Sequence, residues 1–165
     1  PTKLDFYISG ELARIDQITK IGTQTTIIDT LLKRNILLIN LMDKKFGIIL
    51  DGNDTSDVEN IIYSEESEDF LGIECKKAII NSINKKTKKS TTSTIYYTNK
   101  IDNSYNINFK KLKGFPIYYE IISNNIISTY LAVEMTKKNI DPKIFEIDNK
   151  TSIYKMEDFR ALMTQ

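Results

Sequence analysis

Reactive side chains are sparse in this chain, and their types limit the reactions that it could catalyse. The sequence contains no His and a single Cys, Cys75. Without His, a Ser-His-Asp triad, a Cys-His pair and a His-ligated zinc site are all excluded. Its six Gly residues are scattered singly, so the sequence has no glycine-rich phosphate loop. We therefore expect no catalytic residues, no cofactor and no enzymatic activity.

Three remaining residues have side chains of chemical interest, and each has a structural explanation. Cys75 lies in an apolar run without an evident base beside it, so we expect a small buried hydrophobe rather than a nucleophile. Arg14 and Asp16 are two residues apart, which places them on one face of a strand. We expect them to pair with each other or with a neighbouring strand. Paired carboxylates for acid–base chemistry stay open, because any two of the 22 acidic residues could meet in a fold.

Two charged stretches have both a functional and a structural interpretation. An acidic stretch could bind a divalent cation through carboxylate oxygens, but it lacks the calcium-loop spacing, so we expect a solvated loop and no metal site. The basic stretch at 84–89 could meet anionic lipid head groups, yet a charged hairpin tip is the simpler interpretation. The acidic residues concerned are Asp54, Asp57, Glu59, Glu65, Glu66, Glu68 and Asp69.

Length and charge narrow the class of protein further. With 165 residues the chain fits a single domain spanning 1–165, large enough to bury a core. Its 23 basic and 22 acidic residues nearly cancel, and only 3 of the basic ones are Arg. Nucleic-acid binders show a pronounced basic excess, so we expect no nucleic-acid partner. Because the chain begins with Pro1, we also expect an upstream segment to have been removed.

Most of the chain alternates apolar and polar residues with a period of two, which predicts antiparallel strands. The first 50 residues predict a five-strand meander in which neighbours pair in order. We expect Ser56 to cap a short helix near 56–63. Strands at 72–82 and 91–98 then pair with each other, and a polar connection at 99–113 follows. The stretch 155–164 spaces its apolar residues by three or four, which predicts a C-terminal amphipathic helix.

The strongest hairpin signal lies between Leu112 and Phe145. Strands on either side of Asn124 and Asn125 alternate, and one face of the hairpin is nearly continuous apolar surface. We expect this face to be the concave side of a bent sheet that shelters a hydrophobic ligand. The ligand-binding residues predicted on this face are Ile117, Tyr119, Leu131, Val133 and Met135.

Four motifs, in order, resemble a family of small envelope proteins of unknown function. LDFYISGELARID places Gly10, Arg14 and Asp16 as in the family's opening, and LLKRNILLINLMDKKFGII is similar to its second hairpin. FLGIECKKAII resembles a strand shared with the sister group named for its GLPGLI motif. LKGFPIYYEI followed by KNIDPKIFEID resembles the last strand and the end of the family pattern.

This resemblance implies a LolA-like half-barrel, the fold of the outer-membrane lipoprotein carrier. The expected fold class is therefore mainly β (α+β): one curved antiparallel meander sheet, a short helix near 56–63 and a C-terminal helix. The resemblance also implies export to the periplasm or outer membrane, with lipid anchoring on the removed N-terminal segment left open. The expected function is non-enzymatic binding of a lipid or lipoprotein acyl chain. The alternative is a structural or protein-interaction module with a self-filled core, whose partner is another envelope protein.

Overall fold

The structure is a computed structural model that describes residues 3–19, 22–41, 44–50, 57–84, 88–123 and 126–164. The chain forms two compact units. The first contains Pro1–Asn53 and Lys138–Gln165, and the second contains Asp54–Lys137. The expected single domain stays a prediction, because two compact units can belong to one cooperative domain or to two.

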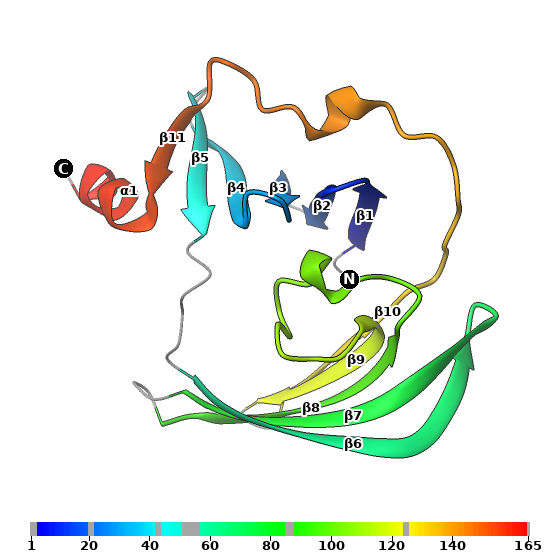
Figure 1. Cartoon of the computed structure of the whole chain (residues 1–165). Coiled ribbons are helices and arrows are strands. Elements are labelled where there is room, and N and C mark those ends of the chain that lie inside the picture. Colours follow the sequence, from blue (N-terminus) through cyan, green and yellow to red (C-terminus); the bar gives the residue numbers. More distant parts are fainter. Residues whose placement is uncertain are drawn as a thin grey trace. The chain divides into compact units, whose positions relative to one another are not determined.

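The first unit is built on a six-stranded sheet in the order β1-β2-β3-β4-β5-β11 (Figure 1). All neighbours are antiparallel except β11, which runs parallel to β5. The predicted five-strand meander is confirmed. The turn between its first two strands contains Gly10, whose φ of 56° suits glycine. The strands are β1 (Lys3–Ser9), β2 (Leu12–Thr19), β3 (Gly22–Asp29), β4 (Arg34–Leu41), β5 (Lys44–Leu50) and β11 (Ser152–Lys155).

One face of this sheet is covered by the segment that contains the 3-10 helix η2 (Pro142–Phe145). Asp141 caps η2 by accepting a hydrogen bond from the backbone N–H of Lys143. Phe145 of η2 is buried. The predicted C-terminal helix is also confirmed as α1 (Met156–Met163), whose buried Phe159 packs edge-on against Phe46 of β5.

The second unit is a five-stranded antiparallel sheet in the order β10-β9-β8-β7-β6. Figure 1 shows that its long strands β6 and β7 are strongly curved. The predicted pairing of 72–82 with 91–98 is confirmed as β7 with β8, and the basic stretch at 84–89 connects them, although 85–87 lie outside the described residues. The strands are β6 (Asp57–Phe70), β7 (Ile73–Asn84), β8 (Ser90–Thr98), β9 (Phe115–Ser123) and β10 (Ile126–Leu131).

The mainly β, antiparallel meander class is confirmed, but two details of the prediction are wrong. The helix near 56–63 is a strand, because Ile61 pairs with Ile80 and Tyr63 with Ala78 in the ladder of β6 and β7. The acidic residues from Glu65 to Asp69 belong to the same strand and not to the predicted loop. Ser56, the predicted capping residue of the helix, lies outside the described residues. The meander also forms two sheets instead of one, since β11 occupies the free edge of β5.

Candidate functional site

The five predicted ligand-binding residues do not share one surface. Ile117 is only 4% exposed, and Tyr119 is half-buried on the same side of β9. In the ladder Tyr119 lies opposite Tyr130, whereas Leu131 lies opposite Tyr118, so Leu131 points to the other face. Val133 and Met135 follow the end of β10 and are exposed. The assumption that all five line one concave face is therefore wrong.

The register itself explains this error. Ser123 pairs with Ile126 in the ladder, so odd-numbered residues of β9 lie opposite even-numbered residues of β10. Asn124 and Asn125, which separate the two strands in the sequence, lie outside the described residues. Pairing two antiparallel strands that are separated by two residues is enough, on the sequence alone, to place Tyr119 and Leu131 on opposite faces.

The concave face of the second unit is filled by its own chain. Figure 1 shows the connection between β8 and β9, which contains the 3-10 helix η1 (Asn103–Tyr105), lying over the concave side of the sheet. Its Phe109 and Leu112 are buried, and the Phe109 ring packs edge-on against Tyr119 with 5.2 Å between centroids. The buried core on this face is formed by Ala78, Ile80, Ile95, Tyr97, Phe109 and Leu112.

Polar contacts fix this covering loop in place. The buried side chain of Asn106 donates to the Phe109 carbonyl at 3.0 Å, and its amide oxygen accepts from the backbone N–H groups of Asn108 and Phe109. The Lys113 ammonium lies 4.6 Å from the centre of the Tyr63 ring, a cation–π contact. Burial raises the pKa of Tyr119 to about 12, as expected for a phenol that loses water contact.

The opposite face of this sheet carries an aromatic cluster of Phe70, Tyr96 and Tyr118. The rings of Phe70 and Tyr118 stack with 5.4 Å between centroids, and Tyr96 packs against both. The Tyr118 hydroxyl donates to Glu120 at 2.5 Å, and this hydrogen bond raises the pKa of Tyr118 to about 12. Because the three rings pack against one another, the cluster stabilises the sheet and does not form an open aromatic cage.

The free edge of this sheet at β10 is the most exposed apolar element of the second unit. Ile126 and Ile127 are 66% and 61% exposed, and Leu131 is 51% exposed. Ala132 donates its N–H to the Ile117 carbonyl at 2.9 Å, so even-numbered N–H groups of β10 point to β9. The N–H groups of Ile127 and Thr129 consequently point away from the sheet, where another strand could bind.

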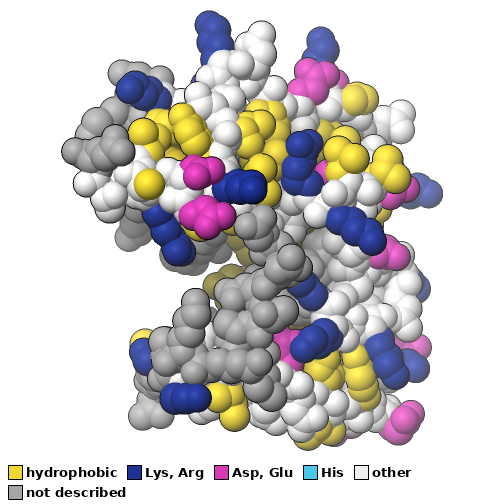
Figure 2. All heavy atoms as spheres, turned by 60° about the vertical axis from the view of Figure 1, so that its left-hand side comes forward, with side chains coloured by type: hydrophobic (Ala, Val, Ile, Leu, Met, Phe, Trp, Pro, Cys, Tyr) yellow, Lys and Arg dark blue, Asp and Glu magenta, His cyan; other side chains and the backbone are white. Residues whose placement is uncertain are grey.

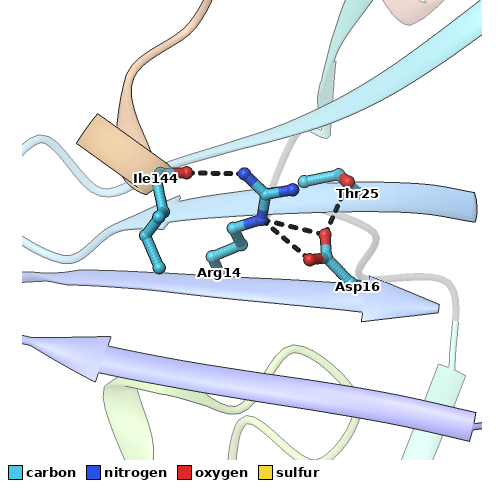
Figure 3. Close-up of polar contacts among 4 residues, drawn as sticks. All are labelled: Arg14, Asp16, Thr25 and Ile144. Carbon is cyan, nitrogen blue, oxygen red and sulfur yellow. Dashed lines mark hydrogen bonds and ion pairs between the residues drawn. The ribbon is translucent and has the colours of Figure 1, made fainter. Parts of the chain in front are cut away.

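In the first unit, the predicted pairing of Arg14 with Asp16 is confirmed (Figure 3). The Arg14 Nε donates to both carboxylate oxygens of Asp16 at 2.9 and 3.0 Å, and the Thr25 hydroxyl donates to the same carboxylate at 2.6 Å. The Arg14 Nη1 donates to the Ile144 carbonyl at 2.7 Å. The cluster therefore ties β2 and β3 to the covering segment, which is a structural role.

Beside this cluster, the covering segment leaves a mostly apolar cavity of about 360 Å³ over the sheet of the first unit. Leu12, Ile27 and Ile36 lie on the sheet side, and Phe145 and Ile147 lie on the covering side. Asp29 and Arg34 add charge to its wall. The cavity is at the small end of the range for small-molecule sites, roughly 300–1,000 Å³.

A larger groove of about 630 Å³ lies in the first unit between β5, β11 and the C-terminal end of α1. Three lysines, Lys44, Lys45 and Lys150, contribute to its wall. The face drawn in Figure 2 shows hydrophobic side chains interspersed with Lys and Arg rather than gathered in one uninterrupted patch. Sequence reasoning missed this groove, because Lys44 and Lys150 are far apart in the chain.

Cys75 is fully buried, as predicted, and its Sγ lies 3.4 Å from the Ile73 carbonyl. Burial raises the pKa of its thiol, which disfavours the thiolate.

Within the described parts of the chain, no three His, Cys, Asp or Glu side chains are placed to hold a metal ion. Over the same residues, no helix combines the length and apolar character needed to cross a membrane.

No family model matches the chain, and a search of curated proteins finds no match.

Proposed function

We propose that this protein is a non-enzymatic interaction module that binds an extended segment of a partner protein along the open edge of β10. The single observation that carries the proposal is the contrast between a concave face closed by Phe109 and Leu112 and an edge strand whose apolar side chains stay exposed. Addition of a strand to an open sheet edge is a common mode of peptide recognition.

The other edge of the same sheet supports the choice of β10. β6 carries Glu59, Glu65 and Glu66 and has an irregular register between Tyr63 and Ser67. Charges and bulges are the features by which sheet edges avoid pairing with other chains. β10, with the sequence IISTYL, contains no charged residue and no Pro. Of the two edges, β10 is the one suited to accept a strand.

The side chains of β10 add selectivity to the backbone contacts. Ile127 lies opposite Ile122 in the ladder, and both are exposed on the face away from Phe109. A partner strand would place every second side chain beside them. We expect such a partner segment to be uncharged and rich in β-branched or aromatic residues, because cross-strand pairs of these types stabilise sheets.

The test compares two substitutions at Thr129. Thr129→Pro removes an outward N–H and leaves the N–H groups that bind β9, whereas Thr129→Val keeps every N–H. A phage-displayed peptide library selected on the wild-type protein should yield binders that Thr129→Pro loses and Thr129→Val retains. Binders that tolerate Thr129→Pro, or failure to enrich any peptide, would contradict the proposal.

Binding of an acyl chain on the concave face stays a prediction that rests on the family resemblance. A ligand there would have to displace Phe109, which packs on Tyr119. Mass spectrometry of organic extracts of the purified protein, together with titration of a fluorescent fatty acid, tests it. Location in the periplasm or outer membrane is likewise a proposal, tested by fractionation of the source cells.

A further inference from the structure

The groove beside α1 combines an apolar wall with a cationic one. Phe46 and Tyr154 lie next to each other with 6.2 Å between ring centroids. Leu162 and Met163 of α1 complete the apolar wall and are 40% and 57% exposed. Exposed apolar side chains of this size, gathered in one groove of about 630 Å³, are typical of a surface that binds another molecule.

The charge of the groove is positive. Lys44, Lys45 and Lys150 belong to its wall, and none of the described residues that line it is acidic. Lys45 donates to Asp148 at 2.6 Å, an ion pair that holds its side chain in place. Its hydrogen bond also keeps the pKa of the Asp148 carboxyl below its usual range. The charge of Lys150 also acts on the Asp148 carboxyl, so one carboxylate faces these lysines and the described wall of the groove keeps a net positive charge.

We propose that this groove is a binding site for a small anionic amphiphile, with one carboxylate, sulfate or phosphate head on an apolar chain. The lysine ammonium groups receive the head, and the wall formed by Phe46, Tyr154, Leu162 and Met163 receives the chain. Charge complementarity selects the anion, and burial of the methylene groups of the chain supplies affinity. This site lies in the first unit and is independent of the β10 edge.

The charges on α1 favour a single amphiphile over a membrane surface. Glu157 and Asp158 occupy its first turn, and both are exposed. Helices that lie on anionic membranes carry mainly Lys and Arg on the polar face, because carboxylates are repelled by the lipid head groups.

Dodecanoate, kept below its micellar concentration, is the probe for the test. Isothermal titration calorimetry should show one saturable site, and NMR should place the shifted resonances at Phe46, Tyr154 and Met163. Dodecyltrimethylammonium has the same tail and the opposite charge, and butyrate has the head with little tail. Both should bind at least about tenfold more weakly, a difference of about 1.4 kcal/mol.

Two variants separate the walls of the groove. Combined Lys44→Gln and Lys150→Gln should weaken dodecanoate binding about tenfold or more, and Leu162→Gln should weaken it severalfold. Lys143→Gln, which removes an exposed charge on η2, is the matched control and should change nothing. Circular dichroism of each variant verifies that the fold is retained.

Several results of these titrations would overturn the amphiphile site. They are equal binding of the cationic probe, unchanged binding by the double Lys variant, and shifts located away from the groove. Binding to vesicles of anionic phospholipid without a saturable dodecanoate site would also overturn it, in favour of a membrane surface. Thr129→Pro should leave dodecanoate binding intact, so failure at one site is distinguishable from failure at the other.

Discussion

The two units cover their sheets in different ways. In the second unit, the cover is the connection between two adjacent strands, β8 and β9, and it fills the concave face with Phe109 and Leu112. In the first unit, the cover comes from a segment 130 residues away from the arginine that binds it, Arg14. It leaves an apolar cavity of about 360 Å³. The local cover thus closes its face, whereas the distant one buries Phe145 but leaves a cavity beside its tether to Arg14.

The largest expected effect breaks the local cover. Phe109→Ala should destabilise the second unit by about 3–5 kcal/mol, because it opens a cavity beneath the loop and removes the contact with Tyr119. Native-state hydrogen exchange of the β8 and β9 amides measures the loss. Lys100→Ala, at an exposed position of the same connection, is the control and should stay within about 0.5 kcal/mol. Comparable losses from both variants would mean that packing is not what holds the loop.

A smaller effect is expected at the tether of the first unit. Arg14→Ala leaves the Ile144 carbonyl and the Asp16 carboxylate without this donor, at a cost of about 1–3 kcal/mol. Hydrogen exchange should lose protection first in residues 142–147. Arg160→Ala removes an exposed guanidinium of α1 in the same unit and serves as the matched control. If both variants behave alike, the tether is only a surface contact.

Alkaline pH should destabilise the second unit through Tyr119, which packs beneath its cover. Burial raises the pKa of Tyr119 to about 12 in the folded state, above the ordinary value near 10. Between these pH values the unfolded chain releases the Tyr119 proton and the folded protein keeps it. The contribution of Tyr119 to the free energy of unfolding is therefore fully present below pH 10 and is lost as the pH rises. The slope from this residue is at most about 1.4 kcal/mol per pH unit. Denaturation of wild type and Tyr119→Phe across this range should show a shallower fall in the variant; parallel curves would contradict the assignment.

The smallest effect belongs to the exposed ion pair of Lys45 with Asp148. Lys45→Gln should cost less than about 1 kcal/mol, because both side chains remain accessible to water. The pKa of Asp148 should rise toward its ordinary value, since the hydrogen bond from Lys45 is the main cause of its lowering. NMR titration of the Asp148 carboxyl measures the shift. An unchanged pKa would show that the pair does not persist in solution.

Much of the fold was predictable because the relevant signals are local. Alternation identified β1 to β5 and β7 to β10, and the spacing of apolar residues in the last segment, Phe159 among them, identified α1. β6 was missed because its acidic residues favour a loop by composition, although Ile61 and Tyr63 keep the strand period. Here pairing with Ile80 and Ala78 overrides the local preference.

The candidate sites were less predictable. The pair of Arg14 and Asp16 was correctly expected from spacing, but Ile144 as its third partner was not, since nothing local connects residues so far apart. The five residues predicted to bind a ligand do not line one face. Odd-numbered residues of β9 lie opposite even-numbered residues of β10, which places Tyr119 and Leu131 on opposite faces of the sheet.

The order of apolar and polar residues by itself determined that this chain forms antiparallel strands paired in sequence, with a short helix at its end. It also shows that the given sequence supplies no imidazole side chain, because it contains no His. Only the tertiary structure decided that β11 ends one sheet, that Phe109 fills the concave face of the other, and that Lys44 and Lys150 meet in one groove. Those features depend on contacts between distant segments, which a periodic pattern does not encode.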